Sequence, residues 1–358
     1  MTASINKLNS GLKDNINPNN ESALYLLASY PKSGNTWVRA FLTALLELQP
    51  LQPLQSLQPP QTRKDNVESN GASNSGIDVN NLIGFGFTER VVMEQNHGID
   101  TADLSIQEIM HLQYAALRQF KKKLSLDKKA GVFFMKDHNA YEGAFRRGQR
   151  GLNDRDLSDR DLSDQRATVF SPDIFNGVIY IVRNPMDVVA SYANHTGGTI
   201  DAAIRDLGST TNLRDNAITK RYTGDWLSSW SGHVSSWCLN DDLPPPLKPL
   251  IVRYEDMLQH SQLIFEQITR FAGLAHEEVA ILAAIEQASF EKLKKKELQT
   301  DFFEKQISSE GFFRKGKSGD WQETLTTQQV QTIISDHGEV MHYLGYLDQD
   351  NKPTELIC

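Results

Sequence analysis

A turn rich in small and hydroxyl residues links a short apolar run to a segment of helical period. Residues 29–37 read Ser-Tyr-Pro-Lys-Ser-Gly-Asn-Thr-Trp. A glycine-containing turn that leads into a helix presents backbone N–H groups and the positive end of the helix dipole, and both suit a phosphate or sulfate. Lys32 adds a cation, and Ser33 and Thr36 add hydroxyls. This turn is not a Walker A loop, because the lysine precedes the glycine. An ordinary strand–turn–helix connection is the alternative.

A second candidate pair is Lys136 and His138, which follow another apolar run. Residues two apart on extended chain project to the same side. A histidine can take a proton from a hydroxyl while a neighbouring lysine stabilises developing negative charge. The pattern therefore predicts a base beside a cation, although the two residues alone could equally form a surface pair.

Two further segments offer anion-binding side chains. Arg183 ends an apolar run and precedes Asn184 and Pro185, which suit the N-cap and first position of a helix. Ser191 lies on that helix, so the arginine and the hydroxyl could hold a second phosphate. Residues 314–321, Arg-Lys-Gly-Lys-Ser-Gly-Asp-Trp, place three cations among two glycines, as in a loop that wraps a phosphate. A structural arginine and a solvated basic turn are the alternatives.

These residues must be positioned by alternating strands and helices. Buried strands are expected at 24–28, 132–135, 178–182 and 250–252, where four or five residues are almost all apolar. Helices are expected at 35–48, 104–123, 186–195, 256–272, 276–288 and 326–343. The alternation predicts an α/β fold with a central parallel sheet between helices. Ligands of such sheets bind beyond the carboxyl ends of the strands, where the candidate residues lie.

Composition excludes several classes of protein. The 358 residues carry a net charge of -8, which disfavours nucleic-acid binding. We find no run of about 18 apolar residues for a membrane span and no apolar stretch of a signal peptide. The two cysteines offer neither a disulfide framework nor a Cys-based zinc site. A cytoplasmic protein without membrane or nucleic-acid partners is therefore expected.

The polar segments predict the domain organisation. Residues 1–21 are expected to be a disordered tail, and residues 22–347 to form one domain. Leu-Gln-Pro units open a low-complexity insert at about 48–81, which is either a surface loop or a lid. An exact five-residue tandem repeat marks a surface insert at about 150–166. Residues 348–358 are expected to form a C-terminal tail.

Together, these segments resemble the cytosolic-type sulfotransferases that use 3′-phosphoadenosine 5′-phosphosulfate (PAPS). The resemblance covers roughly residues 23–346 and looks more like the bacterial members. Residues 30–37 are similar to the family's 5′-phosphosulfate loop, with Asn35 where threonine is usual. The Lys-x-His pair, the 3′-phosphate motif and the closing Arg-Lys-Gly-x-x-Gly-Asp-Trp motif follow in the family's order. The resemblance implies a single-domain sulfotransferase fold, with a central parallel sheet flanked by helices, similar to that of P-loop NTPases.

The resemblance also implies a role for each matched residue. His138 would be the catalytic base, and Lys32 and Lys136 would stabilise the transition state. The 5′-phosphosulfate would be held by Lys32, Ser33, Gly34, Asn35 and Thr36. The 3′-phosphate would be held by Arg183, Ser191, Arg314, Lys315 and Gly316. The adenine would contact Trp37 and Tyr254, and a Ser-Phe pair completes the cofactor-binding positions at Ser289 and Phe290.

The implied reaction is sulfuryl transfer without a metal. His138 would remove the proton from a hydroxyl or amine of a small-molecule acceptor as that group attacks sulfur and the 5′-phosphate departs. Neither the acceptor nor the oligomeric state can be inferred. A P-loop nucleotide kinase would instead need a lysine after a second glycine and acidic Mg²⁺ ligands. A binding protein without catalysis would be expected to lack the base or the cofactor loop, and both are present.

Overall fold

The structure is a computed structural model of the whole chain. It describes residues 9, 22–48, 77–86, 98, 100–101, 104, 106–126, 131–141, 170–214, 225–274, 277–300, 302, 304 and 311–354. The predicted tail at 1–21 lies outside these residues except for Asn9, as do most of the 48–81 insert and the whole 150–166 insert.

Five parallel strands form the sheet, in the order β2-β3-β1-β4-β7. Their bounds are β1 Ala23–Ser29, β2 Phe85–Gly86, β3 Val132–Asp137, β4 Gly177–Val182 and β7 Pro249–Arg253. β1 pairs with β3 on one side and β4 on the other. Every residue of β1 and β4 is buried, as continuous apolar runs predict. The expected strands and the parallel α/β fold are thus confirmed.

Asn9 lies against the backbone of β7, the edge strand next to β4. Its Nδ2 donates to Ile251 O at 3.0 Å, and its Oδ1 accepts from Ile251 N at 2.9 Å. The side chain therefore satisfies two groups that an edge strand leaves without a strand partner.

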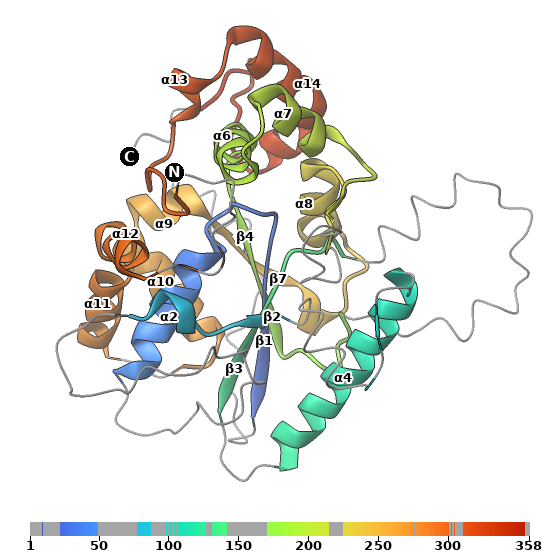
Figure 1. Cartoon of the computed structure of the whole chain (residues 1–358), viewed down its shortest axis with the longest axis vertical. Coiled ribbons are helices and arrows are strands. Elements are labelled where there is room, and N and C mark those ends of the chain that lie inside the picture. Colours follow the sequence, from blue (N-terminus) through green and yellow to red (C-terminus); the bar gives the residue numbers. More distant parts are fainter. Residues whose placement is uncertain are drawn as a thin grey trace, which may run out of the picture.

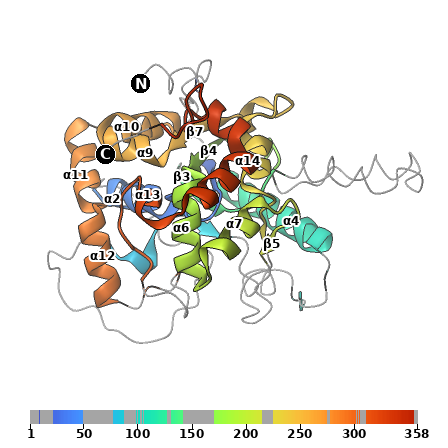
Figure 2. The ribbon, with the colours of Figure 1, turned by 90° about the horizontal axis from the view of Figure 1, so that it is seen from above.

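Helices cover both faces of the sheet (Figures 1 and 2). One apolar cluster joins the inward-facing Leu24 and Leu26 of β1 to α4 (Ile106–Leu126), α6 (Pro185–Thr196), α7 (Ile200–Gly208), α8 (Trp230–Cys238) and α14 (Thr327–Tyr343). The alternate residues Tyr25 and Leu27 pack on α2 (Asn35–Glu47), α9 (Tyr254–Gln259), α10 (Ser261–Phe271), α11 (Glu278–Gln287) and α12 (Phe290–Gln299). This alternation follows from the two-residue period of a strand.

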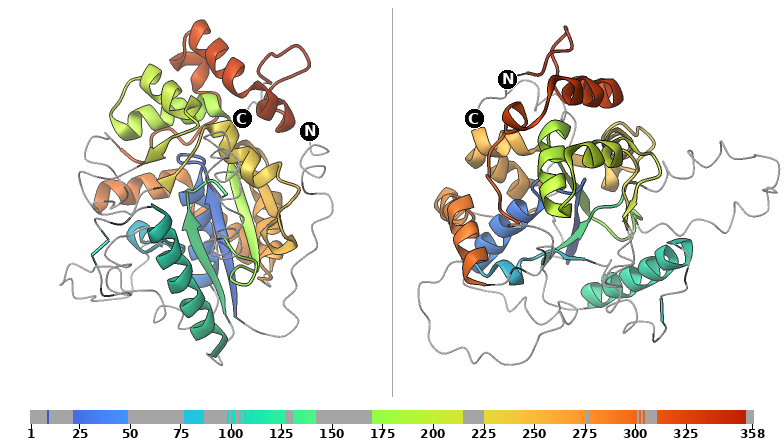
Figure 3. Two further views of the ribbon diagram at one scale, coloured as in Figure 1. Left: turned by 90° about the vertical axis from the view of Figure 1, so that its right-hand side faces the viewer. Right: turned by 45° about the horizontal axis from the view of Figure 1, so that its top comes forward.

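Most expected helices are confirmed to within three residues, and one prediction is wrong. The segment 256–272 is two helices, because His260 leaves helical geometry with φ −136° and ψ 45°. The elements not expected include α7 and α12, the four-residue α13 (Trp321–Thr324), the short η2 (Val79–Asn81) and η3 (Pro245–Leu247), and a hairpin of β5 (Leu213–Arg214) and β6 (Asp225–Trp226). α13 and α14 lie at the same end of the molecule as α6 and α7 (Figure 3).

Within the part of the chain that the structure describes, we find no helix with the length and apolar character needed to cross a membrane.

Candidate functional site

The turn after β1 has the backbone conformation of an anion-binding loop. Lys32 and Gly34 both have positive φ, 69° and 103°, and Gly34 is the N-cap of α2. A Cβ on Gly34 would lie 2.6 Å from Tyr254 Cδ2, so this close approach requires glycine. The turn therefore leads directly into the helix N-terminus, with Asn35 and Thr36 buried in the first turn.

His138 follows β3 and is held against the end of β1. Its Nδ1 lies 2.8 Å from the backbone oxygen of Ser29, which can only accept a hydrogen bond. Nδ1 therefore carries the proton, and the lone pair is on Nε2. Asn35 also binds the end of β1, because its Nδ2 donates to Leu27 O at 3.0 Å and to Ser29 Oγ at 3.2 Å. The side chain of Asn35 thus anchors the turn to β1.

A second histidine, His233 of α8, supports the backbone of His138. It is fully buried, and burial lowers its pKa to about 4, so the ring is neutral. Its Nε2 donates to His138 O at 3.0 Å, while Nδ1 accepts from Tyr180 Oη at 2.7 Å. His233 is therefore a structural group that positions the segment after β3.

The two lysines meet at the same edge of the sheet. Lys136 Nζ lies 3.2 Å from Glu304 Oε2, and Arg39 Nη1 of α2 lies 2.6 Å from Glu304 Oε1. Lys32 Nζ sits 3.9 Å from the centre of the Phe312 ring. Burial lowers the pKa of Lys32 to about 7, with Arg183 and Lys136 adding to the effect and Glu304 and Glu297 opposing it. Its ammonium is therefore primed to gain from a nearby anion.

Arg183 connects this turn to the loop before α13. Its guanidinium lies 4.4 Å from the centre of the Tyr254 ring, donates to Lys317 O at 2.8 Å, and reaches Lys32 O at 3.4 Å. Its Nε is buried and has no hydrogen-bond partner among the described residues, and the same is true of the Ser33 hydroxyl. Buried polar atoms normally have hydrogen-bond partners, so Arg183 Nε and Ser33 Oγ are candidate donors to a ligand that accepts hydrogen bonds.

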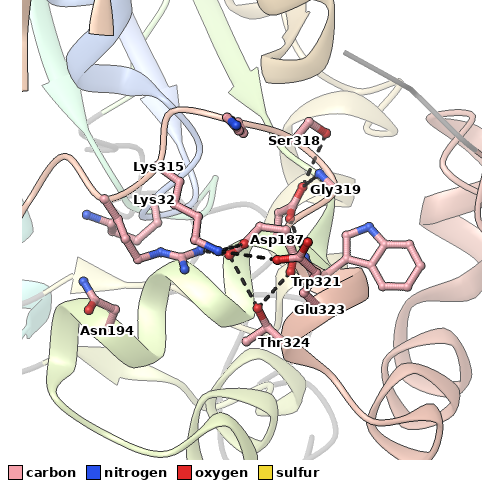
Figure 4. Close-up of polar contacts among 12 residues, drawn as sticks. Lys32, Asp187, Asn194, Lys315, Ser318, Gly319, Trp321, Glu323 and Thr324 are labelled. Carbon is pink, nitrogen blue, oxygen red and sulfur yellow. Dashed lines mark hydrogen bonds and ion pairs between the residues drawn. The ribbon is translucent and has the colours of Figure 1, made fainter. Parts of the chain in front are cut away.

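The loop 314–321 is fastened to α6 by a buried carboxylate, Asp187 (Figure 4). Asp187 accepts from Gly319 N at 2.9 Å, from Trp321 N at 3.1 Å and from the hydroxyl of Ser318 at 3.4 Å. Within the same loop, Arg314 and Lys315 both form ion pairs with Asp320. Those two cations outweigh the effect of burial and lower the pKa of the Asp320 carboxyl.

Aromatic rings border the site. The rings of Trp37 and Tyr254 lie edge to face with centroids 5.7 Å apart. A Cβ on Gly316, whose φ is 64°, would lie 2.3 Å from Phe290 Cδ2, so glycine lets this loop rest on the Phe290 ring.

The structure gathers most of the residues predicted from the sequence. The turn 32–37 contacts Arg183 and Tyr254, and Ser29 links it to His138. Lys136 is linked to α2 through Glu304 and Arg39. Arg314, Lys315 and Gly316 lie in the loop that Arg183 and Asp187 hold. Ser191 is half-buried on α6, and Ser289 is the N-cap of α12. The described contacts do not link these two serines to the others.

Sequence reasoning missed two buried acids, Asp187 and Glu304. Asp187 stands four residues after Arg183 in the predicted phosphate motif, where an acid in the first turn of a helix is a detectable signal. Glu304 lies in no regular element, and no spacing rule connects it to Arg39 or Lys136. Among the described residues, no cluster of three or more His, Cys, Asp or Glu side chains could hold a metal ion.

The fold and the site define an α/β protein that presents cations and a histidine at the carboxyl edge of a parallel sheet. Residues 168–345 match the family model described as "Sulfotransferase domain". Sulfotransferase 1A1 of Canis lupus familiaris is 27% identical over 175 residues, which cover 47% of this chain and 56% of that protein. Sulfotransferase 2A6 of Rattus norvegicus is 28% identical over 172 residues, covering 46% and 57%. Residues 168–345 are thus similar to the sulfotransferase family, and the chain spans a little over half the length of these relatives.

A solved structure of retinol dehydratase, in complex with retinol and PAP, shares the fold. The TM-score is 0.50 at 16% sequence identity, and the match covers 95% of this chain and 85% of that one.

Proposed function

We propose that the protein is a PAPS-dependent sulfotransferase acting on a hydroxyl or amine of a small molecule. The observation that carries the proposal is the meeting of Lys32, Lys136, Arg183 and the Nδ1-protonated His138 at one edge of the sheet. The retinol dehydratase structure, solved with the PAPS product PAP, supports the choice of cofactor.

The residues fit a nucleotide with two anionic groups. The 5′-phosphosulfate would be held by the turn 32–36, where Ser33 Oγ is a buried donor that has no partner in the described part of the chain, as is Nε of the neighbouring Arg183. The 3′-phosphate would be held by Arg183 and Ser191 together with Arg314, Lys315 and Gly316. Because Arg314 and Lys315 bind Asp320, a phosphate there would share or replace that carboxylate. Trp37, Tyr254, Ser289 and Phe290 would border the adenosine.

The protein's own groups would act by positioning, proton transfer and charge stabilisation. Bound PAPS would supply the sulfuryl group. His138 Nε2 would accept the acceptor's proton as the acceptor oxygen or nitrogen bonds to sulfur and the bond from sulfur to the 5′-phosphate oxygen breaks. Lys32, Lys136 and the backbone N–H groups of the turn would stabilise charge on the sulfuryl and departing oxygens.

Calorimetric titration of the full chain with PAP, with ATP and Mg²⁺ as competitor, tests the proposal. We expect tight PAP binding that ATP does not displace and that Lys32→Ala and Arg314→Ala weaken by at least about tenfold, since each removes a charged contact. Lys122→Ala, an exposed site on α4, is the control. Absence of PAP binding, or preference for ATP, would contradict the cofactor assignment. A panel of phenols, alcohols and amines with PAPS then tests transfer.

A further inference from the structure

Glu304 is a buried carboxylate held between two cations from different elements. Its side chain is 10% exposed, against 4% for Arg39 and 21% for Lys136. Arg39 is itself fixed, because its Nε donates to Ile83 O at 2.7 Å while Nη1 binds Glu304. Glu304 is therefore anchored on α2 and presents its second oxygen to Lys136 Nζ at 3.2 Å.

The second carboxylate oxygen of Glu304, Oε2, contacts one of the proposed catalytic groups, Lys136. Lys136 is paired with Leu27 across the β1–β3 ladder, and β1 leads within three residues to Lys32. Lys136 also stands two residues before His138 on the same segment. A lysine ammonium sits on a flexible four-carbon chain, so an ion pair with a fixed acid restricts where the ammonium lies.

Charge balance gives Glu304 a second effect. The groups that act on Lys32 are the cations Arg183 and Lys136 and the acids Glu304 and Glu297, and Arg39 adds a further buried cation through Glu304. Without Glu304, Arg39 and Lys136 would each lose a buried counter-charge, and Lys32 would lose the acid that most opposes the effect of burial on its pKa. A buried lysine that loses its counter-charge gives up its proton more readily, because burial disfavours the charged form.

We infer that Glu304 is a positioning residue that holds Lys136 Nζ at the sheet edge that carries His138 and favours the protonated forms of Lys136 and Lys32. The effect of Glu304 on lysine protonation is inferred from the ion pairs of the structure, and its effect on turnover rests on the proposed function. Burial lowers the pKa of Lys32 to about 7, and Glu304 is the group that most strongly opposes this effect.

The test compares wild type, Glu304→Gln and Glu304→Asp as full chains without cofactor. Lysines are labelled with acetic anhydride over a range of pH, and each site is quantified by mass spectrometry of peptides. Only the neutral amine reacts. We expect Glu304→Gln to move the labelling midpoints of Lys32 and Lys136 about one pH unit lower, and Glu304→Asp to restore much of the wild-type profile.

Asp256→Asn is the matched control, because it removes a buried carboxylate from the Arg253 ion pair, whose side chains are each 4% exposed. It should lower the melting temperature without moving either labelling midpoint. Unchanged midpoints in Glu304→Gln, or equal shifts in the control, would overturn the inference.

Turnover supplies the second readout once PAP binding is established. Glu304→Gln should lower kcat at least about tenfold and move the alkaline limb of the pH–rate profile to lower pH, because the lysines lose their protons earlier. A normal kcat and alkaline limb would overturn the catalytic part. A wild type that neither binds PAP nor turns over would refute the proposed function, and the labelling result would still decide the role of Glu304 in lysine protonation.

Discussion

Single residues in this site are set by their neighbours before any ligand arrives. A backbone carbonyl assigns the proton of His138 to Nδ1, and a buried histidine fixes the backbone that carries His138. Lys32 is left with a lowered pKa by burial among other cations. His138 thus has a defined lone pair on Nε2, and a nearby anion would stabilise the Lys32 ammonium. Both features are expected of groups that are preorganised before a ligand binds.

Lys32 predicts proton uptake on nucleotide binding. Its pKa is about 7 in the folded protein against 10.5 in an ordinary lysine. Between these values the unfolded state holds more protons, so this group's contribution to stability rises with pH across that window. A bound anion favours the charged form, so PAP binding near pH 8 should take up close to one proton. Calorimetry in buffers of different ionisation enthalpy measures the uptake. Lys32→Arg should abolish it, and a wild type without uptake would contradict the prediction.

His138 predicts a separation of chemistry from binding. His138→Ala should lower kcat by about 10² to 10⁴ fold, because general-base assistance is lost, while PAP affinity changes little. Steady-state kinetics with PAPS and calorimetry with PAP measure the two quantities. His111→Ala, at an exposed position of α4, is the control and should retain wild-type kcat. Turnover near wild type in His138→Ala would refute its assignment as base.

At the scale of elements, the site depends on how loops are attached to the sheet edge. Asp187 of α6 holds the backbone of the loop 314–321, and Arg183 holds Lys317 O. Glu297 of α12 similarly accepts from the backbone N–H of Phe312 and of Phe313, at 3.0 Å for the latter. Acids on helices thus secure an irregular segment that local propensity alone would leave unplaced.

Two glycines of the loop 314–321 provide a matched pair for testing its packing. Gly316 and Gly319 both have positive φ, but a Cβ at Gly319 would meet nothing within 4 Å, whereas one at Gly316 would overlap Phe290. Gly319→Ala should cost only about 1–2 kcal/mol of backbone strain. Gly316→Ala should cost more and also weaken PAP binding, because the loop must move. Thermal unfolding and PAP titration measure both effects. Equal losses in the two variants would show that the contact with Phe290 is unimportant.

At the scale of the whole molecule, β1 is the centre of the fold. It lies between β3 and β4, and its alternate residues enter the two apolar clusters on opposite faces of the sheet. The turn 30–34 is the direct continuation of this strand. The buried strand therefore fixes the position of the turn that carries Lys32 and Gly34.

Leu26 of β1 tests the role of this core. It is 0% exposed, so Leu26→Ala should lower the free energy of unfolding by about 2–5 kcal/mol through lost burial and a residual cavity. Leu298→Ala, at a side chain 81% exposed on α12, should change it by less than about 0.5 kcal/mol. Denaturant unfolding measures both. A loss below about 1 kcal/mol for Leu26→Ala would contradict the central placement of β1.

The sequence by itself determined the α/β class, the four long strands and most helices, because continuous apolar runs and helical periods are local signals. It also predicted which segments would carry chemistry, since glycine turns, the Lys-x-His pair and the N-cap at Asn184 are readable from spacing; those roles stay predictions. The cytoplasmic location and the bacterial resemblance stay predictions.

Only the tertiary structure decided how those groups act. The Nδ1 proton of His138 and the lowered pKa of Lys32 arise from contacts between residues far apart in sequence. Asp187 binds a loop more than 130 residues away, and Glu304 joins α2 to β3. Burial and long-range charge depend on the folded chain as a whole, so no local pattern could have revealed them.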